Sequence, residues 1–261
     1  SSSSSSSGSR RHASREAAPQ PLLAAATCKH FIAYHQETFP IERSIISLNI
    51  TNRELWESYM PPFEACVREA SAAQVMCSFN LMNGVPTCAD HGLLTEVLRK
   101  RWGFTGPVVG DYDAWDNMKT KNNFSATWPR ALADGLNAGM DQEGGGTSVV
   151  NLGNVTAAIA ANLTSREAVA LAFKRLFRTR LELGMLDPPG GPASPPAHLL
   201  DLTKDIAGSP DHLKVARRAA REGLCLYKNE GMALPLSSSK LVQAEDLVIV
   251  GPQAAVAGSL F

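Results

Sequence analysis

The chain has 261 residues, of which 44% are hydrophobic and 19% are charged, and its 25 basic residues balance its 25 acidic residues. This composition is typical of a globular protein with one large domain or two small ones. Zero net charge gives no argument for binding nucleic acid or an anionic membrane. No apolar run approaches the ~20 residues that cross a bilayer.

The first 21 residues are rich in serine, arginine and alanine, beginning with seven consecutive serines. Such a segment buries too little apolar surface to order itself, so we expect residues 1–21 to be a disordered tail. Order is expected from residue 22. The small, apolar stretch 24–31 places Lys29 beside His30. A cation next to an imidazole suits hydrogen bonding to ligand hydroxyls, although such a pair is more often two surface polar residues.

Several helices are expected between the apolar stretches. Thr51 and Glu54 have the spacing of a capping box, which predicts a helix that Pro61 and Pro62 then break. Pro62 can occupy the first turn of a second helix that follows. Residues 74–80 form a strand candidate, followed by a turn at 83–84 and a helix that Asp90 caps.

Residues 108–111, Val-Val-Gly-Asp, predict a short buried strand that ends at a carboxylate, with Trp115 and Asp116 in the next loop. In parallel-sheet and barrel enzymes the groups that do chemistry lie where strands end. A lone aspartate in this position is more often a solvated loop residue. The other nearby acids, Asp113, Asp116 and Asp141, are expected to be caps or acceptors of backbone hydrogen bonds.

The alternation of helix and strand continues beyond Asp111. We expect a helix from Thr127, a very short strand at 139–141, and a long helix that starts at a Thr164/Glu167 capping box and closes at Gly184. Val169, Phe173, Leu176, Phe177 and Leu181 are expected to form the apolar face of that helix. This order is typical of a parallel α/β domain.

Residues 187–196 contain five prolines and two glycines and mark the clearest boundary in the chain. We therefore predict a first domain at 22–187, a linker at 188–210, and the start of a second α/β domain at 211–261. The second domain should begin with a helix at 212–222 and strands at 223–229 and 247–250.

Five cysteines without a C-x-x-C spacing give no support for a zinc or redox site, and no metal site is expected. Cys77 and Cys88 flank the turn at 83–84. They form a disulfide in an oxidising compartment or stay as two buried thiols. Four N-x-S/T sequons, at Asn49, Asn123, Asn154 and Asn162, permit a secretory route.

Seven motifs, in this order, resemble glycoside hydrolase family 3, and most closely its plant-type β-xylosidase branch. The resemblance runs from about Cys28 to Pro252. Its pieces are 28–31 (CKHF), 59–63 (YMPPF), 75–90 with its TCAD ending, 102–111 (WGF to VGD), 138–141 (AGMD), 183–187 (LGMLD), and 228–236 (KNE to LPL).

The resemblance implies an α/β fold: the C-terminal half of a (β/α)₈-type barrel, a linker, and the start of an α/β sandwich domain. It implies retaining hydrolysis of terminal β-linked sugars, with Asp111 as the nucleophile that forms a covalent glycosyl-enzyme. Lys29 and His30 match residues that hold the sugar hydroxyls, and Met76 and Phe79 match residues that line the same subsite. No cofactor is implied. β-Glucosides and α-L-arabinofuranosides are the alternative substrates.

Three departures from the family pattern bear on this reading. Phe79 replaces the usual tyrosine, which removes one contact that would orient Asp111. Gly110 stands for a serine, and Tyr112 and Gly144 stand for two cysteines, so a disulfide between those two sites is not possible. The family's early barrel strands should precede Lys29, and its general acid/base should lie beyond Phe261.

An alternative is therefore a catalytically dead fragment or a carbohydrate-binding remnant, and we expect the 261-residue chain alone to hydrolyse an aryl β-xyloside no faster than buffer. The resemblance implies a secreted, cell-wall or vacuolar protein, although no signal peptide is found. A glycoside or oligosaccharide is the expected partner, with no nucleic acid and no membrane. The oligomeric state is left open.

Overall fold

The computed structural model describes residues 22–38, 40–145, 148–188, 190–191, 194, 199 and 201–236. The predicted tail at 1–21 and the predicted strand at 247–250 lie outside the described residues. The chain divides into two compact units, Ser1–Leu200 and Asp201–Phe261, and this division falls inside the predicted linker at 188–210.

The first unit is organised around a parallel sheet of three strands, β1 (Thr27–Phe31), β3 (Gln74–Cys77) and β6 (Val108–Gly110), in the order β1-β3-β6. The register places Cys77 opposite both Phe31 and Gly110. Strands β3 and β6 are largely apolar, and all three strands bury residues in the core, which suits a sheet covered by helices. The predicted α/β class is confirmed.

A fourth segment touches this sheet through one parallel bridge between Val109 and Gln142. The strand predicted at 139–141 is thus reduced to a bridge one residue later. Gly139 has φ 121° and ends the preceding helix, so the chain reaches an extended conformation only after it.

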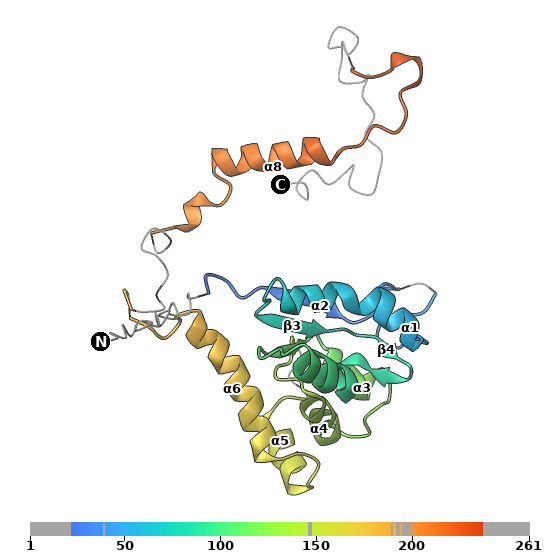
Figure 1. The fold of residues 1–261 in the computed structure, drawn as a ribbon, viewed down its shortest axis with the longest axis vertical. Helices are drawn as coiled ribbons and strands as arrows, with labels where there is room; N and C mark the ends of the chain where they lie inside the picture. The colour runs from blue at the N-terminus through green and yellow to red at the C-terminus, as the bar shows by residue number, and fades with distance from the viewer. Residues whose placement is uncertain are drawn as a thin grey trace, which may run out of the picture. The chain divides into compact units, whose positions relative to one another are not determined.

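Helical segments connect the strands. Between β1 and β3 run α1 (Asn52–Glu54), the π-helix η1 (Leu55–Tyr59) and α2 (Met60–Arg68). The π-helix η3 (Gly92–Arg101) links β3 to β6, and α4 (Trp128–Ala138) follows β6. In Figure 1, α2 lies beside β3, while α4, α5 (Leu152–Ala160) and α6 (Arg166–Glu182) follow one another on the other side of the unit.

The predicted capping box is confirmed: Thr51 accepts from the Glu54 backbone N–H at 3.2 Å, and Glu54 accepts from the Thr51 N–H at 2.9 Å. The predicted position of Pro62 in the first turn of a second helix is confirmed, whereas the predicted break before that helix is wrong, because η1 continues directly into α2. The prolines lie in the first turn of α2, where a missing N–H removes few helix bonds, and the chain reaches them through a π-helical turn rather than an end.

A second, small sheet joins β2 (Ser47–Leu48), β4 (Leu81–Met82) and β5 (Val85–Pro86). Asn83 and Gly84 form the predicted turn, with φ of 51° and 85°, which is the backbone of a type I′ hairpin. The 3₁₀ turn η2 (Thr87–Ala89) follows. Asp90 then caps η3 as predicted, accepting from the Leu93 N–H at 3.0 Å.

Helices α3 (Ala114–Thr120) and α5 (Leu152–Ala160) were not predicted, and the loop expected at Trp115 and Asp116 is wrong. Trp115 is 1% exposed, and its indole N–H donates to the Ala131 carbonyl at 2.6 Å. The chain enters α3 through Asp113 at φ 63°, without a side-chain cap, so the sequence carries no start signal.

Helix α6 (Arg166–Glu182) closes at Gly184 as predicted, at φ 67°. Its N-cap is Ser165 rather than Thr164, since the Ser165 hydroxyl accepts from the Ala168 N–H at 3.1 Å. The predicted apolar face is wrong in part: Phe173 is 60% exposed, whereas Ala172 is buried. The small residues of this helix, not its largest ones, pack against the unit.

The second unit contains the 3₁₀ turn η4 (Lys204–Ile206), helix α8 (Pro210–Gly223) and the 3₁₀ turn η5 (Glu230–Met232). Helix α8 confirms the prediction at 212–222. The strand predicted at 223–229 is wrong: residues 224–229 pair with no described strand, and Tyr227 is 96% exposed. An extended segment becomes a strand only when a neighbour accepts and donates its backbone hydrogen bonds.

Four cysteines form two disulfides. Cys77 pairs with Cys88, with their Cα atoms 5.3 Å apart, and Cys28 pairs with Cys66, with theirs 6.6 Å apart. Cys77–Cys88 is one of the two alternatives given from the sequence, a disulfide rather than two buried thiols. The Cys28–Cys66 bridge, from β1 to α2, was not predicted. Cys225 is free and exposed.

Removing the Cys77–Cys88 bridge with the double substitution Cys77→Ala/Cys88→Ala is expected to lower the unfolding free energy of the first unit by about 2–4 kcal/mol, because the unfolded chain regains the freedom of the closed loop. Urea unfolding followed by tryptophan fluorescence measures this loss. Cys225→Ala is the matched control and should change nothing. An equal free energy for the double variant and the wild type would contradict a formed bridge.

Candidate active site

Asp111 lies directly after β6, at the edge where the parallel strands end. Its backbone N–H donates to the Cys77 carbonyl at 3.1 Å, which ties it to the end of β3. Its Oδ1 accepts from the Tyr112 N–H at 2.8 Å, and its side chain is 13% exposed. The carboxylate is therefore fixed by two neighbouring segments and keeps limited access to solvent.

His30 approaches Asp111 from β1: Nε2 lies 3.3 Å from Asp111 Oδ2. The β1–β3 register shifts between Cys28 and Phe31, where His30 lies, and such irregularities commonly redirect a side chain near a site. Burial lowers the pKa of His30, and the negative charge of Asp111 opposes this shift. The neutral imidazole is thus favoured at neutral pH and can donate one hydrogen bond and accept another.

Lys29 lies beside His30 but is exposed. Both residues line a cavity of about 220 Å³ between the end of β1 and the helices that follow, together with Tyr34, His35, Tyr59 and Phe63. Asp111 is not among the residues of its wall. The cavity therefore gives a ring-sized space next to the His30–Asp111 pair rather than over the carboxylate itself.

Phe79 is buried two residues after β3, and the Arg43 guanidinium lies 4.6 Å from its ring centroid. Arg43 also donates to the Tyr34 hydroxyl at 3.2 Å, and the Tyr34 ring lies 4.8 Å from the His30 ring. A packed chain of rings and one guanidinium thus connects Phe79 to His30. Sequence reasoning missed Arg43 and Tyr34, because the loop that carries Arg43 has no periodic pattern.

Met76 lies in the middle of β3, opposite Val109 in the register, and is half-buried. Its strand neighbours Val75 and Cys77 are almost fully buried, as the alternation of a strand requires. Met76 therefore faces the less covered side of the sheet.

Glu143 is a second acid near Asp111, at the edge where the parallel strands end (the Asp111 edge), and sequence reasoning did not single it out. It follows the Gln142 bridge, and its Oε1 accepts from the Gly144 N–H at 2.9 Å. Its Oε2 is buried without a hydrogen-bond partner. Burial raises the pKa of Glu143 to about 8, and the charges of Asp116 and Asp113 add to this shift. The sequence feature that could have pointed to Glu143 is its position two residues after Asp141.

Glu143→Gln is expected to stabilise the first unit at alkaline pH. The pKa of about 8 in the folded protein lies above the ordinary value of 4.5, so the stability present at low pH is lost as pH rises from about 4.5 to about 8. Glutamine keeps the acceptor and carries no charge, which gives a gain on the order of 4 kcal/mol above pH 8 that shrinks towards pH 5.

Urea unfolding at pH values from 5 to 9 measures this difference. Glu57→Gln, which removes an exposed carboxylate paired with Arg53, is the control and should show no such trend. A gain for Glu143→Gln that is the same at every pH would contradict a buried proton on Glu143.

Gly110, Tyr112 and Gly144, the three positions near Asp111 that depart from the family pattern, lie together in space. A side chain at Gly144 would overlap the Gly110 carbonyl, and one at Gly145 would overlap the Tyr112 ring. A Cβ at Gly110 would lie 3.4 Å from Glu143 Oε1, with Met140 Cε at 2.9 Å. The glycines let the segment around Glu143 pack directly on the backbone of Asp111.

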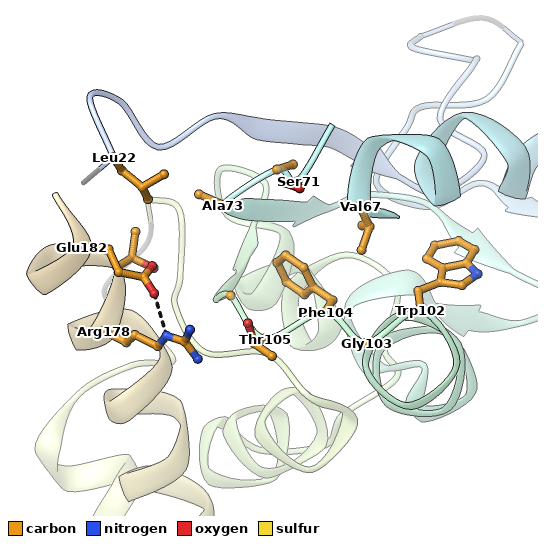
Figure 2. Close-up of a pocket in the computed structure, with 13 residues that line it drawn as sticks. Leu22, Val67, Ser71, Ala73, Trp102, Gly103, Phe104, Thr105, Arg178 and Glu182 are labelled. Carbon is orange, nitrogen blue, oxygen red and sulfur yellow. Dashed lines mark hydrogen bonds and ion pairs between the residues drawn. The ribbon is translucent and has the colours of Figure 1, made fainter. Parts of the chain in front are cut away.

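A second cavity, also of about 220 Å³, lies at the opposite ends of the strands (Figure 2). It is bordered by Ala73, which precedes β3, and by Gly106, which precedes β6. The Arg178–Glu182 ion pair, at 2.7 Å, stands at its side. None of the predicted site residues lines this cavity, so the candidate site lies at the sheet edge that carries Asp111 and not here.

Among the described residues, no group of three or more His, Cys, Asp or Glu side chains is placed to hold a metal ion. In the same part of the chain, no helix has the length and apolarity that a membrane span requires.

The chain matches known proteins over most of its length. Residues 15–179 match the family described as glycosyl hydrolase family 3 N terminal domain. The chain is 34% identical to β-xylosidase/α-L-arabinofuranosidase 1 of Medicago sativa subsp. varia over 89% of this chain and 29% of that protein. It is 36% identical to probable β-D-xylosidase 6 of Arabidopsis thaliana over 89% and 28%.

Solved structures agree. A GH3 exo-β-xylosidase in complex with a xylobiose aziridine activity-based probe gives a TM-score of 0.74 at 33% identity, covering 84% of this chain and 28% of that one. A β-glucosidase from Listeria innocua in complex with isofagomine gives 0.66 at 27% identity, covering 82% and 28%. The chain spans less than a third of the length of these relatives. It belongs to glycoside hydrolase family 3, as part of that family's N-terminal domain.

Proposed function

We propose that this chain supplies the nucleophile and sugar-binding edge of a retaining glycosidase that releases terminal β-linked xylose. The observation that carries the proposal is the placement of Asp111 at the end of β6, 3.3 Å from His30 of β1 in the same parallel sheet. The sheet would then be part of a (β/α)₈-type barrel, with groups for chemistry at the carboxyl ends of its strands.

In this mechanism the Asp111 carboxylate attacks the anomeric carbon and forms a covalent glycosyl-enzyme, which water then hydrolyses. A second carboxyl, about 5–5.5 Å away in such enzymes, protonates the leaving group and later activates the water. Asp111 is held by the Cys77 carbonyl and the Tyr112 N–H, so it can attack with little rearrangement. We propose that the second carboxyl comes from the family's second domain.

The neighbours of Asp111 take binding roles in this proposal. His30 hydrogen-bonds a sugar hydroxyl with the ring nitrogen that is not directed at Asp111, and Lys29 donates to a second hydroxyl from the rim of the cavity. Phe79 and Met76 provide apolar surface for the faces of the sugar ring. Arg43, packed over Phe79, fixes the orientation of that ring.

Relatives named as β-xylosidases favour a xyloside as substrate, and one of them is also named as an α-L-arabinofuranosidase. Solved β-glucosidases share the fold at lower identity, so a β-glucoside is the alternative. A second candidate function is carbohydrate binding without turnover. Phe79 favours it, because a phenyl ring offers no hydroxyl to hydrogen-bond a nucleophile.

Binding of an iminosugar tests the site without requiring turnover. A xylose-configured iminosugar, which is cationic at neutral pH, should bind the chain. Asp111→Asn should weaken binding by roughly 10–100-fold through the loss of one charge-assisted hydrogen bond. Titration calorimetry measures both affinities, and a glucose-configured analogue ranks the two substrate classes. Equal affinities for wild type and Asp111→Asn would contradict the proposed site.

A further inference from the structure

The four sequons of the chain are not used by the proposed glycosidase site, and the structure describes all four asparagines. They lie in three different settings: after β2 (Asn49), after α3 (Asn123), and at the start and end of α5 (Asn154 and Asn162). None of them lines the cavity next to His30. Their side chains can therefore be judged by exposure and hydrogen bonding alone.

Asn49, Asn123 and Asn162 are exposed. Asn123 and Asn162 occupy left-handed turn positions, with φ of 51° and 54°, which asparagine tolerates better than most residues. Within the described part of the chain, the side-chain amides of these three residues form none of the observed hydrogen bonds. Replacing one amide hydrogen of each by a sugar would disrupt no such bond.

Asn154 differs from the other three. It is half-buried, and its Nδ2 donates both to the Ser148 carbonyl at 2.7 Å and to the Val149 carbonyl at 2.9 Å. Both amide hydrogens are needed for these bonds. A glycan on Nδ2 would remove one hydrogen and place a bulky sugar against the backbone that precedes α5.

The disulfides are a second, independent observation. Four of the five cysteines are paired, as Cys28–Cys66 and Cys77–Cys88. Structural disulfides form and persist in the secretory pathway and are rare in a reducing cytosol. The same pathway modifies N-x-S/T asparagines.

We propose that Asn49, Asn123 and Asn162 carry N-linked glycans in the folded protein and that Asn154 does not. In the transfer, each side-chain nitrogen forms a bond to the anomeric carbon of a lipid-diphosphate-linked oligosaccharide. The bond from that carbon to the phosphate oxygen breaks, and the lipid diphosphate leaves with the electron pair while the amide gives up one proton. Polar glycans at these turns enlarge the solvated surface and leave the Asp111 edge open.

The full chain, produced behind a cleavable secretion leader in a eukaryotic host, tests this proposal. Glycopeptides from the secreted and the cell-retained fractions are released with a glycan-specific amidase in ¹⁸O water and mapped by mass spectrometry. Secreted protein should be labelled at Asn49, Asn123 and Asn162 and unlabelled at Asn154. Asn49→Gln, Asn123→Gln and Asn162→Gln should each remove one glycan without changing secretion.

Two results would overturn the proposal: secreted protein without glycan at the three exposed sites, or secreted protein with Asn154 occupied as fully as the others. If the chain is retained in the cell, the map of that fraction decides the three exposed sites in the same way. Iminosugar binding is measured on the same sample, so that a failure of the glycosidase proposal is seen separately.

Discussion

Asp141→Ala is expected to lower the unfolding free energy of the first unit by about 3–5 kcal/mol, one of the largest effects of any single substitution in the chain. The Asp141 side chain is fully buried and accepts from Arg99 at 2.6 Å, Arg175 at 3.0 Å and the Val108 N–H at 2.8 Å. It therefore ties η3, α6 and the start of β6 together.

The physical reason for this loss is the charge left behind. Burial raises the pKa of Asp141, and the charges of Arg99 and Arg175, with the Val108 N–H, oppose that shift. Without the carboxylate, the guanidinium of Arg99, 7% exposed, loses its counter-ion. Urea unfolding followed by tryptophan fluorescence measures the loss.

A double variant separates the buried charge from lost packing. Asp141→Leu/Arg99→Leu removes both charges and should be less destabilised than Asp141→Leu alone. Glu57→Ala, which breaks an exposed ion pair with Arg53, is the control and should cost less than about 1 kcal/mol. A loss below about 1 kcal/mol for Asp141→Ala would contradict the structural role.

This network also shows what sequence reasoning reached and what it did not. The prediction for Asp141 was a cap or an acceptor of a backbone hydrogen bond, and the Val108 N–H confirms the second alternative. Asp116 fits the same description, since its Oδ1 accepts from the Val149 N–H at 3.1 Å. The two arginines come from different helices, and no local pattern pairs them with a distant acid.

Elements with strong local signals were predictable. The Thr51/Glu54 capping box, the turn at Asn83 and the strand that ends at Asp111 each follow from residue types at fixed spacing. Helix α3 was not predictable from the sequence, because it starts from Asp113 in a left-handed conformation without a side-chain capping bond. Tertiary contacts decide such a segment: Trp115 is buried against α4.

In the candidate site, too, some residues were predictable from the sequence and others were not. Asp111 and His30 were named from the sequence, and the structure brings them within 3.3 Å. Glu143 was missed, although it lies at the same edge, because its burial and its unpartnered oxygen exist only after the glycines at 110 and 144 allow the two segments to pack closely. Burial and close backbone packing are properties of the fold and leave little trace in residue order.

The second large effect is expected at Asp111. A 2-deoxy-2-fluoro-β-xyloside with a dinitrophenolate leaving group needs no general acid, because dinitrophenolate departs without protonation. The fluorine slows release of the sugar, so the covalent intermediate accumulates. The reagent therefore isolates the nucleophilic step that we assign to this chain.

Mass spectrometry of the intact chain and of its peptides after this reaction is the most direct test of Asp111 as the nucleophile. We expect one fluoroxylosyl group per chain, attached to Asp111. Asp113→Asn, two residues away, should react as the wild type does, and Asp111→Asn should not react. A label on another carboxylate, or none at Asp111 in protein that binds the iminosugar, would contradict the assignment of Asp111 as the nucleophile.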